Sequence, residues 1–153
     1  MIKNLLCCIA VLLAACSTPQ KSFDKQNYGR AFELALAALQ RNKSVKENKT
    51  ILNKSLNELI KEGFTEAGQK KNSTDLRDKD RALKIYENLQ DKIKDAVPFI
   101  GQEYAPQYEQ LQDFALDVQN ELYLIYLQNG LNQLNQAIDQ KQKKLAQQAY
   151  TNL

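Results

Sequence analysis

Clustered carboxylates are the side chains of this sequence whose type and spacing could do chemistry. Asp75, Asp78 and Asp80 lie close enough together to suggest a calcium site. However, the glycine and the bidentate glutamate of a calcium-binding EF-hand loop are missing, and three cations alternate with these carboxylates. Acidic residues also favour a helix N-terminus, where the helix dipole places partial positive charge. We therefore expect a charged helix start here and no metal site.

Glu103 and Glu109 form a second candidate pair, because two carboxylates near aromatic residues can hydrolyse glycosides. They flank Tyr104, Pro106 and Tyr108. No other feature of the sequence indicates a saccharide-binding cleft, so we expect this stretch to be a structural hinge between helices.

The classes of catalytic site that use histidine or cysteine are restricted by composition. The chain contains no histidine, and its three cysteines are Cys7, Cys8 and Cys16. This disfavours Ser-His-Asp triads, Cys–His nucleophiles, haem ligation by histidine and the usual zinc sites. Catalysis by Asp, Glu, Lys, Ser or Tyr stays open. We nevertheless predict a protein without enzyme activity, catalytic residues, metal or cofactor.

The N-terminus has the pattern of an export signal. Lys3 precedes an uncharged, mostly aliphatic run over residues 5–15, which ends in Leu13-Ala14-Ala15-Cys16. The run is roughly half of the ~20 apolar residues that a membrane-spanning helix needs. An ordinary secretory signal also has a charged start, a short apolar core and small residues at its end.

The quartet before and including Cys16 resembles the lipobox of bacterial lipoproteins. The resemblance implies cleavage before Cys16, a diacylglycerol thioether on its sulfur and a fatty acyl chain such as palmitate on its amine. Several acyl chains on one cysteine would hold the protein on a membrane durably. Ser17, in place of an aspartate, implies release to the outer membrane, and we expect the domain to face the periplasm.

Charge and composition indicate a helical domain that does not bind nucleic acid. The chain has 21 basic and 18 acidic residues, and the two signs are interspersed. A nucleic-acid surface would show clustered basic residues. Ala, Leu, Gln, Lys and Glu, which are good helix formers, dominate the sequence. We predict an all-α fold in one small domain.

The first helices are predicted from apolar residues at helical spacing. One helix covers about residues 25–40. A second begins at Ser44, which forms a capping-box pattern with Glu47. Gly63 is a candidate stop for this helix, unless the helix tolerates it. A polar loop is expected over residues 69–74.

The later helices are bounded by prolines and glycines. A residue among 73–75 can cap the third helix, and we expect Pro98 to stop it, because a proline disfavours helical geometry in the residue before it. A fourth helix should start near Pro106. Gly130 ends or bends that helix, and further helical patterns follow as far as Leu153.

Three segments repeat one pattern of small and aromatic residues. They lie at Tyr28–Leu39, Ala82–Leu89 and Ala146–Leu153. The pattern resembles the second helix of a tetratricopeptide repeat, which implies irregular antiparallel helical hairpins, about five to six helices in all. A regular array has a period of about 34 residues, whereas the pattern here recurs at larger and unequal intervals. Plain helical-bundle packing would produce much of the same pattern.

We therefore divide the chain into a signal peptide (1–15), a lipidated cysteine with a flexible tether (16–23) and a helical domain (24–153). The sequence ends within an amphipathic pattern. Three interpretations stay open for this end: an incomplete domain, an end that docks on another surface, or a frayed terminus.

The expected function is a non-enzymatic, membrane-anchored scaffold that binds a protein or peptide of the cell envelope. Its groove would be lined by some of Tyr86, Tyr123 and Tyr126, since aromatic residues often bind peptides on tetratricopeptide-like surfaces. Two alternatives stay open. One is a structural envelope protein that self-associates, and the other is an accessory subunit of an envelope enzyme or transport complex.

The lipobox prediction has a direct test. Cys16→Ser removes the sulfur that would carry the diacylglycerol, so the precursor should stay uncleaved and should lose labelling by radioactive palmitate. Normal acyl labelling of this variant would refute the prediction.

Overall fold

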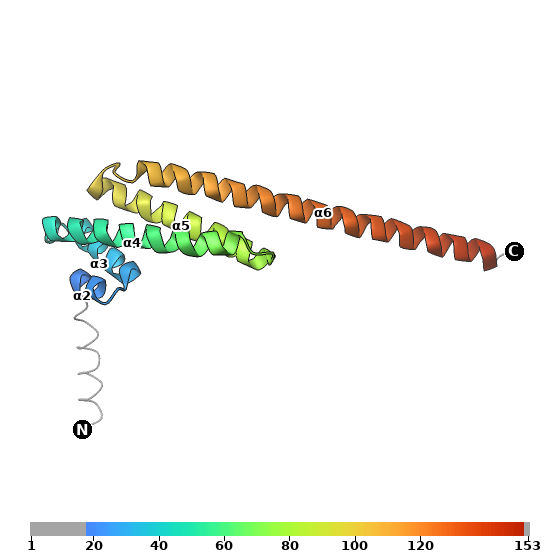
Figure 1. Ribbon diagram of the computed structural model, residues 1–153, viewed down its shortest axis with the longest axis horizontal. Helices are drawn as coiled ribbons and strands as arrows, with labels where there is room; N and C mark the ends of the chain where they lie inside the picture. Colours follow the sequence, from blue (N-terminus) through green and yellow to red (C-terminus); the bar gives the residue numbers. More distant parts are fainter. Residues whose placement is uncertain (1–17, 152–153) are drawn as a thin grey trace, which may run out of the picture.

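The computed structural model of the protein describes residues 18–151, and all regular structure in that range is α-helical (Figure 1). The helices are α2 (Pro19–Asp24), α3 (Tyr28–Gln40), α4 (Val45–Lys71), α5 (Leu76–Ile100) and α6 (Ala105–Thr151). The predicted all-α fold is thereby confirmed. The lipobox with Cys16, and Leu153 at the other end, lie outside the described residues.

The three long helices α4, α5 and α6 lie side by side and antiparallel, while α3 packs on α4 and α2 packs on α3 (Figure 1). The helices from α3 to α6 have 13, 27, 25 and 47 residues. Antiparallel hairpins of unequal length were expected from the sequence. The likeness to tetratricopeptide repeats stays a prediction.

The flexible tether predicted before residue 24 is wrong over Pro19–Phe23, because these residues belong to helix α2. Pro19 is favourable in a first turn, where its missing N–H needs no partner. The Thr18 side chain caps the helix by accepting a hydrogen bond from the Lys21 N–H (3.2 Å). The Phe23 ring lies 5.3 Å from that of Tyr28 in α3. This contact holds α2 on the domain.

Helix α4 begins at Val45, as predicted, but without the expected capping box. Ser44 has a left-handed backbone (φ +42°), and its side chain makes no capping hydrogen bond. A capping side chain reaches the helix amides from an extended backbone, which Ser44 does not have. Instead, the Asn48 side chain donates to the Lys43 carbonyl (2.8 Å) and closes the turn from inside the helix.

Gly63 does not stop α4, which continues to Lys71 and so shortens the predicted loop over 69–74. Gly63 is buried, and a Cβ atom placed on it would lie 2.6 Å from Leu89 Cδ1 in α5. The glycine therefore leaves room for a close contact between two helices and does not form a turn. Such a contact between distant parts of the chain is invisible in the local pattern around Gly63.

Pro98 does not stop α5 either, since the helix includes it and ends at Ile100. A proline inside a helix removes one backbone hydrogen bond and costs about 3 kcal/mol. The loss falls in the last turn, where Phe99 and Ile100 pack against the core and offset it. The chain then turns at Gly101, which has φ +72° and donates its N–H to the Val97 carbonyl (2.9 Å).

Helix α6 starts at Ala105, with Pro106 in its first turn as predicted. Gly130 neither ends nor bends it into separate segments: a single helix runs to Thr151. A glycine costs about 1 kcal/mol in a helix interior relative to alanine, which weakens a long helix without breaking it.

An aromatic cluster joins the three long helices in the core. Phe64 from α4, Tyr86 from α5 and Phe114 from α6 lie with ring centroids 5.7 to 6.3 Å apart. Tilted and edge-on rings at these distances attract each other beyond their simple apolar burial. The cluster therefore fixes α6 against the α4–α5 hairpin.

The contact at Gly63 predicts opposite effects for two glycines of α4. Gly63→Ala should destabilise the protein, because overpacking against buried Leu89 costs about 1–3 kcal/mol. Gly68→Ala has open space around the new methyl group and should stabilise the protein by up to about 1 kcal/mol through helix propensity. Urea unfolding followed by circular dichroism measures both, and a Gly63→Ala protein more stable than wild type would contradict the close contact.

Candidate functional site

The structure separates the three tyrosines that were expected to line one groove. Tyr86 is only 2% exposed and belongs to the aromatic core cluster, so its predicted role in partner binding is wrong. Burial raises the pKa of its phenol. Tyr123 and Tyr126 lie on α6 with 65% and 59% of their surface exposed. The three tyrosines differ because a tyrosine on the apolar face of a helix is buried only where another helix packs against that face.

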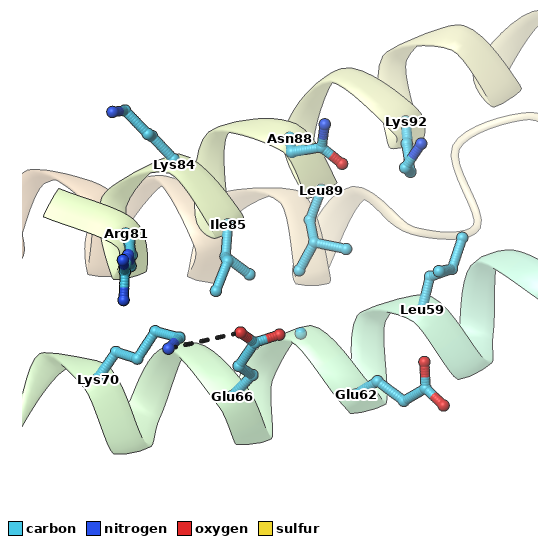
Figure 2. A pocket seen from close by; sticks show the side chains of 11 residues that line it. Leu59, Glu62, Glu66, Lys70, Arg81, Lys84, Ile85, Asn88, Leu89 and Lys92 are labelled. Carbon is cyan, nitrogen blue, oxygen red and sulfur yellow. Dashed lines mark ion pairs between the residues drawn. The ribbon is translucent and has the colours of Figure 1, made fainter. Parts of the chain in front are cut away.

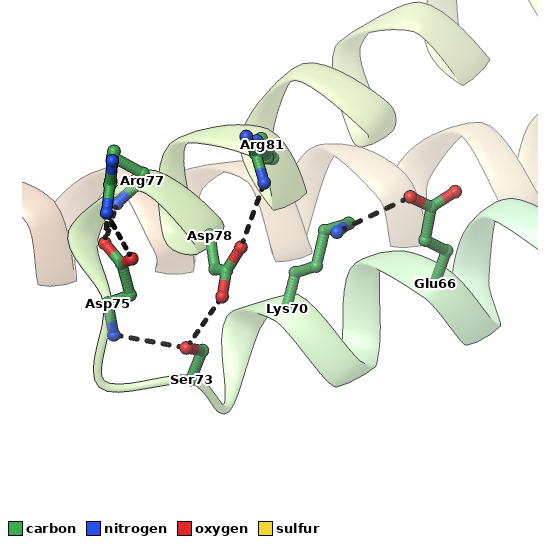
Figure 3. A network of polar contacts seen from close by, with 7 residues as sticks. All are labelled: Glu66, Lys70, Ser73, Asp75, Arg77, Asp78 and Arg81. Carbon is green, nitrogen blue, oxygen red and sulfur yellow. Dashed lines mark hydrogen bonds and ion pairs between the residues drawn. The ribbon is translucent and has the colours of Figure 1, made fainter.

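The acidic cluster after α4 organises the turn into α5 (Figure 3). Asp75 accepts a hydrogen bond from the Arg77 N–H (2.9 Å) and pairs with the Arg77 guanidinium (3.2 Å). These bonds hold the pKa of Asp75 below its ordinary value. Asp78 accepts from the Ser73 hydroxyl (3.0 Å) and pairs with Arg81 (3.5 Å). The predicted charged helix start is confirmed.

The third carboxylate of the cluster, Asp80, pairs with Lys84 one turn further along α5 (2.8 Å). Within residues 18–151, no group of three or more His, Cys, Asp or Glu side chains is placed to hold a metal ion. The three aspartates thus point to different basic or hydroxyl partners and do not converge.

Glu103 and Tyr104 attach the α5–α6 turn to the middle of α4. Glu103 accepts a hydrogen bond from the Asn53 side-chain amide (2.9 Å). The Tyr104 hydroxyl donates within the same contact, to the Asn53 carbonyl (3.1 Å) and to its side-chain oxygen. Tyr104 is buried, which raises the pKa of its phenol. These contacts agree with the structural role that was expected for this stretch.

An open groove runs between α4 and α5 on the face shown in Figure 2. Its floor is apolar, and charged side chains form its rim. The rim cations are already engaged within the protein. Three of them pair with carboxylates, and the fourth lies over an aromatic ring: Lys70 with Glu66 (3.7 Å), Arg81 with Asp78, Lys84 with Asp80, and Lys92 over Phe32 (5.2 Å). The cations of the groove therefore already have partners within the protein, which makes them less available to an anionic ligand.

Two ion pairs hold α6 at the point where α5 begins. Lys71, at the end of α4, pairs with Asp117, and this hydrogen bond raises the pKa of Lys71. Lys79 pairs with Glu121 (2.7 Å) and also donates to the Lys71 carbonyl (2.7 Å). The side chain of Lys79 is only 14% exposed. Both pairs thus join the α4–α5 turn to one turn of α6.

Beyond this point α6 projects from the bundle (Figure 1). We call residues 126–148 the projecting segment, because each of them is exposed. At 1.5 Å per residue this segment is about 35 Å long. No helix within the described residues is both long and apolar enough to span a membrane.

A row of large apolar side chains begins at Leu124, just before the projecting segment, and continues along it; we call it the outer row. Its members are each between 45% and 62% exposed: Leu124, Leu127, Leu131, Leu134, Ile138 and Leu145. Large exposed apolar patches on soluble domains mark interaction surfaces. The arrangement can bury surface against another molecule, and it places no reactive groups together.

The outer row was not predicted as a site, although its leucines form a helical pattern in the sequence. A signal was present, because residues 122–138 contain no charged side chain at all. The polar residues in that run are Asn, Gln and Tyr. This stretch was expected only to continue the helical pattern, and docking of the C-terminal end on another surface was one of the three interpretations left open.

The burial of Tyr86 predicts its reactivity. Tetranitromethane nitrates accessible tyrosinates, so Tyr126 and Tyr150 should react well before Tyr86, whose raised pKa also lowers its phenolate fraction. Mass spectrometry of tryptic peptides after brief treatment at mildly alkaline pH measures the order. Equal nitration of Tyr86 and Tyr126 would show that Tyr86 is not in the core.

The comparisons with known proteins add no template for this site. The chain matches no protein-family model, no curated protein and no solved structure. The candidate site therefore follows from the geometry of the helices and the distribution of side chains along α6.

Proposed function

We propose that the protein is a lipid-anchored, non-enzymatic scaffold of the bacterial outer membrane that faces the periplasm and binds protein through its projecting segment. The observation that carries the proposal is the outer row. Full burial of a leucine or isoleucine is worth about 1.5–3 kcal/mol, and each of the six side chains in this row is about half exposed. A protein surface laid along α6 would therefore gain substantial binding free energy.

The chemistry of the described residues supports binding over catalysis. The carboxylates whose spacing suggested a metal site each form an ion pair or a capping hydrogen bond: Asp75, Asp78 and Asp80. Glu103 is committed to the turn between α5 and α6. In contrast, the outer row has no partner within the bundle.

The first described helix and the proposed binding surface lie at opposite ends of the described structure. Helix α2, which follows the lipobox in sequence, packs at one end of the bundle, and α6 extends from the other (Figure 1). An acylated Cys16 would hold the first end at the membrane. The projecting segment would then be free to meet a partner away from the bilayer.

The test is in-cell crosslinking of the tagged, full-length protein, followed by mass spectrometry of the captured proteins. Wild type should capture a small, reproducible set, which includes either itself or other envelope proteins. Leu127→Glu with Leu131→Glu should abolish capture, because two buried charges replace two apolar contacts.

The matched control is Asn129→Glu with Gln136→Glu, which adds the same charge to the same helix. These positions lie on the side of α6 away from the outer row, so capture should persist. Capture of no protein by wild type, or equal loss in both variants, would contradict binding through the outer row.

A further inference from the structure

We propose that the projecting segment of α6 pairs with the same segment of a second copy of this chain, in a two-stranded coiled coil. The inference rests on the proposed function, because it names the partner of the same surface. It commits to a second copy for three reasons: the spacing of the outer row, its position around the helix and its lack of charge.

The spacing of the outer row is that of a heptad repeat. Its residues follow each other at alternating steps of three and four, apart from one wider gap before Leu145. Helices with apolar residues at positions a and d of a heptad supercoil around each other. Here position a is held by Leu124, Leu131, Ile138 and Leu145, and position d by Leu127, Leu134, Lys141 and Gln148.

The outer row lies on the opposite side of α6 from the face that packs on α5. Buried Leu111, Val118 and Leu122 form the inner face. Further along α6, the same face continues through Asn129 and Gln136, which are polar and exposed. With 3.6 residues per turn, the outer row is about half a turn away. A second helix can therefore reach it without displacing α5.

The width of the outer row fits one partner helix. The neighbouring heptad positions e carry Gln128, Asn135 and Gln142, which are all polar and exposed. A helix that packs within a larger bundle has an additional apolar position beside a and d, whereas a two-stranded coiled coil needs only a and d. On the other side, the positions g carry Tyr123, Gly130, Ala137 and Lys144, which do not form a continuous row of large apolar side chains. The apolar stripe is thus narrow enough for a single helical partner.

The neutrality of this stretch favours a second copy over a charged partner or a lipid surface. Residues 122–138 carry no charge, so two copies would not repel each other along that stretch, whereas Lys141, Lys143 and Lys144 follow it and disfavour close pairing near the end of the segment. A helix that lies on an anionic membrane has lysine and arginine on its polar face; residues 122–138 have neither, and the three lysines of the projecting segment are confined to positions 141, 143 and 144. A charged protein partner would likewise find no opposite charge in this stretch.

The stability of a free helix also points to a partner. Isolated helices are marginal in water, and most helices are stabilised by packing of their apolar face. The projecting segment is exposed along its whole length and includes Gly130, which lowers its helix propensity further. Pairing through the outer row supplies the packing that the bundle does not give.

Lys141 occupies a d position and sets a measurable limit on the strength of the pair. A lysine in the apolar layer of a coiled coil lowers its stability while restricting its register. Replacing Lys141 by leucine should therefore strengthen the pair. This variant therefore tests the contact between the two helices by a gain in affinity and not by a loss.

The experiment is sedimentation equilibrium of the full chain in a density-matched non-ionic detergent, over a range of micromolar concentrations. Wild type should reach twice the protein mass. Leu131→Glu with Leu134→Glu should raise the dissociation constant at least about 100-fold, whereas Asn129→Glu with Gln136→Glu should leave it nearly unchanged. Lys141→Leu should lower it about tenfold.

A monomer at every concentration would overturn the inference, as would a dimer that Leu131→Glu with Leu134→Glu does not weaken. A stable mass above two copies would overturn the two-stranded geometry. The inference can fail without failure of the proposed function. A monomeric protein would still act as a scaffold if its in-cell capture of other proteins depended on the outer row. Thermal unfolding monitored at the same time verifies that each variant keeps its bundle.

Discussion

The contact between Gly63 and Leu89 determines how closely α4 and α5 approach, and the rest of the bundle depends on that distance. Because Gly63 has no side chain, Leu89 can occupy the space where a Cβ would be. The next residue, Phe64, then reaches both Tyr86 in α5 and Phe114 in α6. One close approach thus allows a single aromatic cluster to hold all three long helices.

Hydrogen bonds and ion pairs of charged side chains fix the α4–α5 turn and the direction of α6. The α4–α5 turn is held by Asp75 and Asp78, and the Lys79–Glu121 pair joins the same turn to α6. Since these charged side chains are paired with one another within the bundle, they hold α5 and α6 in place. The neutral part of α6 begins immediately after the last of these pairs.

The two faces of α6 explain how one helix can serve the core and the surface. Its inner face is apolar only as far as α5 lies beside it and becomes polar at Asn129, while the outer row continues to Leu145. If the helix merely extended the core, its inner face would stay apolar. This change of face along one helix supports the proposal that the outer row binds a partner.

The sequence by itself determined the helical class, most helix starts and the charged N-terminus of α5, because these depend on local spacing and capping. A cap among residues 73–75 and the helix start near Pro106 were predicted from neighbouring residues alone. Only the tertiary structure decided that Gly63 and Pro98 lie within helices, since packing of distant residues compensates their local cost. Helix α2 differs, because its local signals in Thr18 and Pro19 were present in the sequence and the prediction of a tether overlooked them. The tertiary structure also decided that Tyr86 is core and Tyr126 is surface. Helical spacing marks an apolar face in both cases, but whether that face is covered depends on where the neighbouring helix begins and ends.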